Sequence, residues 1–293
     1  MRDHTKAALF VIGAMLSFTI MAVMGREVGQ DLQTFEIMTY RSVIGIVLVV
    51  GIAVLSGTLN QITAQRFGLH LLRNIFHFTG QNLWFYAVLF IPLSQLFAFE
   101  FATPIWLAIL APIFLGERVT SLRVIGIVLG FVGILIVARP DLSTINLATL
   151  AAFGCAIFFA ATSITTKLLT RTESLTCILF WLVVLQLILG IAASMWDGKI
   201  TWPEPNHWPY LTVIGIAGLS AHFCLTRALG LADATFVAPL EFLRLPLIAV
   251  IGYVLYAEPL LWSVGIGALL VLAGNYLNII AQSRATPTKP VTS

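Results

Sequence analysis

Charge is scarce in this sequence. Only 10% of its 293 residues are charged, whereas 59% are hydrophobic, and the mean hydropathy is +0.98. Soluble domains carry about 25% charged residues, so the composition excludes that class and indicates an integral membrane protein. The net charge of +3 is small and gives no support for a nucleic-acid partner. The partner that the composition predicts is the lipid bilayer.

Cysteine is scarce as well, and the common catalytic motifs are absent. The three cysteines are Cys155, Cys177 and Cys224, each within an apolar run and without CxxC or metal-type spacing. Such cysteines are typical of small buried hydrophobic side chains. The sequence contains no P-loop, HExxH, GxSxG or paired-aspartate motif, which argues against ATP-driven transport within this chain and against the common enzyme chemistries. We therefore expect no catalytic residue, no cofactor and no metal.

Long apolar runs are abundant. A helix needs about 20 apolar residues to span a bilayer, and the runs predict an all-α integral membrane protein with ten transmembrane helices. The first run is interpreted as an uncleaved helix, because it is long and no clear signal-peptidase site follows it. The predicted spans lie near 6–25, 35–55, 70–90, 94–115, 120–138, 147–168, 175–195, 209–230, 234–256 and 260–281.

The positions of Lys and Arg predict the orientation. With the N-terminus in the cytoplasm, ten basic residues fall in inside segments and three in outside segments. This bias follows the positive-inside rule. The other three, Arg41, Arg227 and Arg244, lie within predicted helices. We predict a multi-pass protein of the cell membrane, inner or plasma, with both chain ends cytoplasmic.

An internal repeat organises the chain. An offset of 141 residues, without a gap, aligns polar and glycine positions of the two halves. The most informative pairs are Glu100 with Glu241, Gly13 with Gly154, Gly126 with Gly267 and Gly133 with Gly274. We predict one five-helix repeat over 1–141, a second over 142–283 and a disordered cytoplasmic tail over 284–293. Because five is odd, the second repeat must be inverted, an architecture in which transporters bind substrate between the halves near the midplane.

Two helix ends and two glycine patterns carry a resemblance to a known family. The fourth helix closes with Phe114-Leu115-Gly116-Glu117-Arg118, and Leu255-Tyr256-Ala257-Glu258-Pro259 is a weaker copy. The fifth and tenth helices carry spaced glycines, namely Gly126, Gly130, Gly133, Gly265, Gly267 and Gly274. From about residue 6 to about 281 the chain resembles the EamA-like family of the drug/metabolite transporter superfamily.

The resemblance implies two five-helix halves that rock to give alternating access. It also implies a central cavity lined mainly by the third, fourth, eighth and ninth helices, with the first and sixth contributing. Members are associated with amino acids, nucleosides, other metabolites and drugs, so the resemblance leaves the substrate open.

Charged residues inside the predicted helices are the main candidates for substrate binding. Glu100 and Glu241 occupy equivalent points of the repeats, so we expect them near a common axis. A charge at the bilayer centre costs about 2.5–3.5 kcal/mol, so it normally faces a protein interior or a wet cavity. Arg244 follows Glu241 by three residues and shares its helix face, whereas its repeat counterpart is Thr103. The planar guanidinium suits a carboxylate or phosphate. The alternative is a structural ion pair that never contacts substrate.

Other candidates share one face of the third helix. His77, Gln81 and Trp84 are spaced i, i+4 and i+7, and Gln81 pairs by repeat with His222 on the eighth helix. Histidine can relay protons near neutral pH, or it can hydrogen-bond a neighbouring helix. Two further aromatic candidates are Phe101 and Phe242, whose rings either line the cavity or pack against lipid and protein.

Structural and gating roles are assigned to other residues. The prolines predicted to kink helices, open the cavity and allow gating are Pro104, Pro239 and Pro246. Gly126 and Gly130 form a GxxxG face, which predicts close packing within the chain or in a homodimer. Arg41 is expected to brace the bundle with Glu36 or with carbonyls at a helix end.

These observations predict a secondary active transporter for a small polar organic metabolite, amino-acid-like, nucleoside-like or otherwise zwitterionic or anionic. Its energy source is the substrate gradient or protons. One alternative is efflux of organic cations or drugs, with the glutamates as counter-charges; charge selectivity separates the two. Another is a membrane enzyme or a structural or receptor subunit acting on a lipid, which predicts chemical turnover or a stable partner without translocation.

Overall fold

The computed structural model describes residues 2–115, 120–138, 146–195, 200–231 and 244–285. Within these ranges the regular secondary structure consists of α-helices and one short 3-10 helix, without a strand. Five of the described helices are long and apolar enough to cross a membrane. The predicted class, an all-α membrane protein, is confirmed.

The helices follow the predicted spans. In the first half they are α1 (Arg2–Val28), α2 (Thr34–Leu55), α3 (Phe67–Phe90), α4 (Leu93–Glu100), α5 (Thr103–Leu115) and α6 (Ser121–Ala138), with the 3-10 helix η1 (Leu59–Gln61) between α2 and α3. In the second half they are α7 (Leu147–Leu169), α8 (Leu175–Ser194), α9 (His207–Leu231), α11 (Arg244–Tyr256) and α12 (Trp262–Ala285).

The helix boundaries repeat along the chain. Both α5 and α11 have 13 residues, and α11 begins and ends 141 residues after α5. The same offset relates the ends of α1 and α7, the starts of α2 and α8, the ends of α3 and α9, and the starts of α6 and α12. The two halves therefore share one register without a gap.

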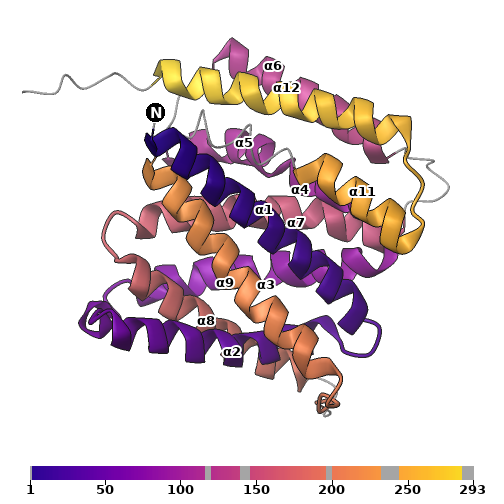
Figure 1. The fold of residues 1–293 in the computed structure, drawn as a ribbon. Coiled ribbons are helices and arrows are strands. Elements are labelled where there is room, and N and C mark those ends of the chain that lie inside the picture. Colours follow the sequence, from indigo (N-terminus) through magenta and orange to yellow (C-terminus); the bar gives the residue numbers. More distant parts are fainter. Residues whose placement is uncertain (1, 116–119, 139–145, 196–199, 232–243, 286–293) are drawn as a thin grey trace, which may run out of the picture.

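The packing of the helices shows how the halves interlock (Figure 1). Helix α1 lies along α9, α3 lies along α7, α2 packs on α8 and α6 packs on α12. Replacing each helix by its counterpart in the other half converts the α1–α9 pair into the α7–α3 pair and leaves the α2–α8 and α6–α12 pairs unchanged. This is the pattern that a pseudo-two-fold axis produces. The fold is two inverted five-helix repeats.

The fourth predicted span is not one continuous helix. It divides into α4 and α5, with turns at Phe101 and Ala102 between them. The freed carbonyl oxygen of Phe101 accepts a hydrogen bond from Nδ2 of the buried Asn275 at 2.9 Å. The hydroxyl of Thr103 donates to the carbonyl oxygen of Glu100 at 2.6 Å. Discontinuous helices of this kind place polar backbone beside a cavity.

The break corrects the role predicted for the first proline. Pro104 is the second residue of α5. In the first turn of a helix a missing N–H removes no hydrogen bond, so this proline helps to start a helix and does not kink a continuous one. Pro246 is likewise in the first turn of α11 as described, and Pro239 lies outside the described residues.

The predicted glycine face packs within the chain. A Cβ atom added to Gly274 on α12 would lie 2.5 Å from the carbonyl oxygen of Gly126 and 2.8 Å from the backbone nitrogen of Gly130. One added to Gly133 would lie 2.6 Å from the carbonyl oxygen of Gly267. Helices α6 and α12 thus meet backbone to backbone, and the glycine face of Gly126 and Gly130 lies against α12.

Candidate functional site

A central cavity of about 280 Å³ lies between the two halves. Its walls come from α1, α3, the α4–α5 junction, α7, α9 and α11, which correspond to the first, third, fourth, sixth, eighth and ninth predicted spans. Seven of the predicted substrate-binding residues line it: His77, Gln81, Trp84, Glu100, Phe101, His222 and Arg244. The other two, Glu241 and Phe242, lie outside the described residues.

An ion pair between the halves borders this cavity. Nη2 of Arg244 donates to Oε1 of Glu100 at 2.6 Å, and the two side chains are 7% and 17% exposed. Nε1 of Trp84 donates to the other carboxylate oxygen, Oε2, at 2.8 Å. Each oxygen of Glu100 therefore has a partner. The pair joins one half of the chain to the other, and Glu241, three residues before Arg244, lies outside the described residues.

Aromatic rings surround the guanidinium. The Cζ atom of Arg244 lies 4.7 Å from the ring centroid of Phe97, 4.8 Å from that of Phe18 and 5.0 Å from that of Phe101. Rings at these distances attract a cation through their quadrupoles, more strongly where water is excluded. The surroundings thus hold a cation in an apolar region, and within the described residues its buried Nε–H has no partner.

Two histidines face each other across the cavity. The rings of His77 and His222 are 6.0 Å apart at 66°, and the ring of His222 lies 5.9 Å from that of Phe18. His77 is 4% exposed, and within the described chain its Nε2 has no hydrogen-bond partner. Buried polar atoms are rarely left without partners. This nitrogen therefore offers a hydrogen-bonding group to a molecule in the cavity.

Arg41 was expected to brace the bundle with Glu36 or with carbonyls at a helix end, and Glu36 has other partners in the structure. Glu36 is 1% exposed, and its carboxylate accepts from the backbone N–H groups of Gln33 at 2.9 Å and Thr201 at 2.5 Å. These bonds attach the link before α9 to the start of α2. In the described part of the chain, Nη1 of Arg41 is buried without a hydrogen-bond partner. The guanidinium instead lies beside Gly218 of α9.

Three residues outside the cavity have metal-ligand chemistry. The ligand atoms of His70, Glu173 and Cys177 lie within 4.8 Å of one another. Thr63 already occupies two of them, because its hydroxyl donates to Glu173 at 3.0 Å and its carbonyl accepts from the Cys177 thiol at 3.3 Å. We interpret the group as the contact that docks the α2–α3 link on α8.

The sequence analysis missed a second buried ion pair. Nη1 of Arg26, near the end of α1, donates to Oε1 of Glu258, which follows α11. The prediction treated Arg26 as an outside-loop residue. A signal was present in the repeat register, since 141 residues separate Arg26 from Lys167 and Glu117 from Glu258. Inversion of the repeat therefore puts Arg26 and Glu258 at one end of the predicted bundle and Lys167 and Glu117 at the other. Glu117 lies outside the described residues.

The hydrogen bond from Trp84 gives a first test of the site. We expect Trp84→Phe to keep an aromatic ring but remove the N–H that donates to Glu100. The apparent affinity for substrate should fall about tenfold or more, because hydrogen bonds to charged groups contribute about 1.5–3 kcal/mol. The measurement is the substrate concentration at half-maximal uptake in proteoliposomes. Trp106→Phe is the matched control, because the indole of Trp106 packs on Phe131 and Phe153 and its Nε1 has no partner among the described residues. Equal affinities for both variants would contradict the role of Trp84.

Comparisons with known proteins agree with the fold. Residues 5–139 and 146–280 each match the model of the EamA-like transporter family. The riboflavin transporter of Brucella anthropi is 30% identical over 84% of this chain and 88% of its own. The S-adenosylmethionine uptake transporter of Rickettsia bellii is 27% identical over 99% of this chain and 100% of its own. A crystal structure with 16% sequence identity covers 96% of this chain and 98% of its own with a TM-score of 0.66, a likeness of fold alone.

Proposed function

Because the chain belongs to the EamA-like transporter family, we propose that this small-metabolite transporter carries a zwitterionic or anionic molecule by alternating access. The observation that carries the proposal is the Glu100–Arg244 ion pair at the cavity wall. One charge comes from each half, 144 residues apart in sequence. A ligand that contacts both charges therefore contacts both moving parts.

The ion pair favours a zwitterion over an organic cation. A carboxylate that reaches Arg244 displaces Glu100, and an ammonium group on the same ligand then supplies the partner that Glu100 has lost. Both buried charges stay paired throughout, whereas an uncompensated buried charge is strongly unfavourable. An organic cation alone would satisfy Glu100 and leave Arg244 with only its aromatic neighbours. This reasoning ranks the cation-efflux alternative second.

The rest of the lining suits a flat conjugated ring with a polar edge. Trp84, Phe18 and Phe159 present aromatic surface to the cavity, and His77 and Gln81 add hydrogen-bonding groups on one face of α3. Aromatic pairs prefer stacked or edge-to-face contacts. Riboflavin and S-adenosylmethionine, the compounds in the relatives' names, each contain a fused nitrogen heterocycle. We infer a nucleoside-like or amino-acid-like substrate.

The test is uptake by purified protein in liposomes. We expect saturable uptake of a compound that carries a heterocycle and an amino-acid group, such as S-adenosylmethionine, and much weaker uptake of its decarboxylated analogue, which lacks only the carboxylate. Adenosine serves as the ring without either charge. Preferential transport of the decarboxylated cation would overturn the zwitterion proposal and favour the cation carrier.

Energy coupling is tested in the same vesicles. The proposed proton carrier is Glu100, the acid at the cavity wall. If protons drive transport, an imposed pH gradient accelerates uptake by the wild type and has no effect on Glu100→Gln. If the pH gradient does not change uptake by the wild type, the substrate gradient remains as the energy source.

A further inference from the structure

The ion pair of Arg26 and Glu258 lies in an unusual setting for charges at helix ends. Each side chain is only 11% exposed. Ion pairs at a protein surface contribute little, and buried pairs persist only where the remaining donors and acceptors are also bonded. We therefore expect partners for the remaining N–H groups and carboxylate oxygen of the pair.

The remaining groups of the pair clamp a third segment, the link between α3 and α4. Nε of Arg26 donates to the carbonyl oxygen of Val88 at 2.6 Å, and Nη2 donates to that of Ile91. On the other side, Oε2 of Glu258 accepts from the backbone N–H of Leu93 at 2.9 Å. The pair thus joins α1 and the α3–α4 link of the first half to the α11–α12 link of the second.

The α11–α12 link is held in a strained conformation beside the pair. Ala257 has a φ of 51°, in the left-handed region that non-glycine residues rarely adopt. The ring of Tyr256 lies 4.7 Å from Cζ of Arg26, and its hydroxyl donates to Glu27 at 2.8 Å. Strained backbone persists only where neighbouring contacts hold it, and it is often found in segments that switch. Here the contacts that hold it are the ion pair, the Tyr256–Glu27 bond and a backbone bond from Glu258 to Gly252.

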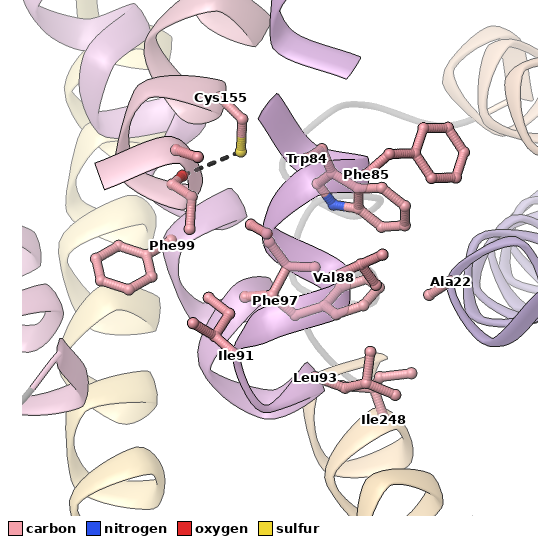
Figure 2. Close-up of a cluster of buried hydrophobic side chains, with 14 of the residues drawn as sticks. Ala22, Trp84, Phe85, Val88, Ile91, Leu93, Phe97, Phe99, Cys155 and Ile248 are labelled. Atoms are coloured by element: carbon pink, nitrogen blue, oxygen red, sulfur yellow. Dashed lines mark hydrogen bonds between the residues drawn. The ribbon is translucent and has the colours of Figure 1, made fainter. Parts of the chain in front are cut away.

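A layer of fully buried apolar side chains separates the pair from the central cavity. We name as the apolar plug the residues Ala22, Val88, Leu93, Phe97 and Ile248, each 1% exposed or less (Figure 2). They belong to α1, α3, α4 and α11, which also line the cavity. Along α1, Arg26 lies eight residues beyond the cavity-lining Phe18, about 12 Å at 1.5 Å per residue.

A second hollow lies on the other side of the pair. It has a volume of about 500 Å³ and is lined by Arg26, Leu89, Tyr256, Glu258 and neighbouring residues. The plug and the pair therefore stand between two hollows that share α1 and α3 as walls. This is the geometry of a path through the bundle that is closed at one end.

We propose that Arg26 and Glu258 are the gate of the transport cycle at this end of the bundle, closed in this structure. The proposal rests on the alternating access proposed above. Opening the path requires Glu258 to leave Arg26, which frees the α3–α4 link and lets the apolar plug separate. The distribution of basic residues assigns this end to the outside of the membrane.

The test measures whether the plug becomes accessible from this end. The native cysteines, Cys155, Cys177 and Cys224, are first replaced by alanine, and Ala22→Cys then provides a reporter in the plug. Protein in liposomes is treated with a membrane-impermeant, positively charged thiol reagent applied from one side at a time. With the gate intact, we expect slow modification from the Arg26 side.

Glu258→Gln removes the charge and keeps the size of the side chain. We expect it to raise the modification rate of the reporter from the Arg26 side at least tenfold. A second reporter, Ser163→Cys, lies on the exposed part of the cavity lining, and its modification from the opposite side should fall in the same variant. The matched control is Glu204→Gln, the same change at an exposed glutamate, which should leave both rates unchanged.

A second variant covers the case in which Glu258→Gln does not fold. Tyr256→Phe removes only the hydroxyl that donates to Glu27, and we expect an increase of about threefold at the plug reporter. Unchanged rates in whichever of the two variants folds would overturn the gate. The thiol rates report on the gate without a substrate. The proposed function is therefore tested separately, and it fails if the wild type transports none of the compounds tested.

Discussion

Arg244→Ala is expected to reduce substrate uptake by at least about tenfold. The substitution removes the group that contacts the anionic part of the ligand, and hydrogen bonds to charged groups contribute about 1.5–3 kcal/mol. It also leaves Glu100 buried without its partner across the halves. The measurement is initial uptake in proteoliposomes at equal protein content. Arg227→Ala is the control, because Arg227 is exposed and contacts only the ring of Phe223 in the described contacts.

A double variant separates binding from structure. Glu100→Gln combined with Arg244→Gln leaves no lone buried charge, so we expect its thermal stability to recover relative to Arg244→Ala. Uptake should stay low, since neither charge remains for the ligand. If the double variant transported at the wild-type rate, the pair would be a structural tie that never contacts substrate.

Gly274→Ala is expected to lower the stability of the protein by about 1–3 kcal/mol, the usual range for overpacking. The new Cβ atom would lie 2.5 Å from the carbonyl oxygen of Gly126 and 2.8 Å from the backbone nitrogen of Gly130. Both obstacles are backbone atoms, so no side chain can rotate away and α6 must separate from α12. The expected result is a lower melting temperature in detergent.

Gly265→Ala is the matched control on the same helix. An added Cβ atom there has no heavy atom within 4 Å, and alanine favours helix over glycine by up to about 1 kcal/mol. We expect the melting temperature to stay constant or to rise. If both variants melted at the same temperature, the backbone contact between α6 and α12 would not limit stability.

The fold was predictable because the bilayer sets the length of an apolar helix and because the two halves share a register. The offset that aligns Glu100 with Glu241 also aligns the bounds of α5 and α11. Helical spacing was enough to place His77, Gln81 and Trp84 on one face, and all three line the cavity. These inferences rest on regular spacings, which can be read directly from the sequence.

The features that escaped prediction depend on contacts between distant segments. The break after α4 is supported by Asn275 from the other half, and no local pattern indicates that contact. Arg244 pairs with Glu100 across 144 residues, whereas helical spacing relates Arg244 only to residues of its own helix. Glu258 was noted only as part of a helix-end pattern, because the sequence does not show that Arg26 and the N–H of Leu93 lie against it.

The division of the Glu100–Arg244 pair between the halves has a consequence for biosynthesis. Glu100 enters the bilayer long before Arg244 has been translated, and an unpaired charge at the centre of a membrane helix costs about 2.5–3.5 kcal/mol. Trp84, made 16 residues earlier than Glu100, is the partner already present in the nascent chain. Its indole N–H can hold the carboxylate until the second repeat arrives. A residue of the proposed binding site would thus also help the unfinished protein to insert into the membrane.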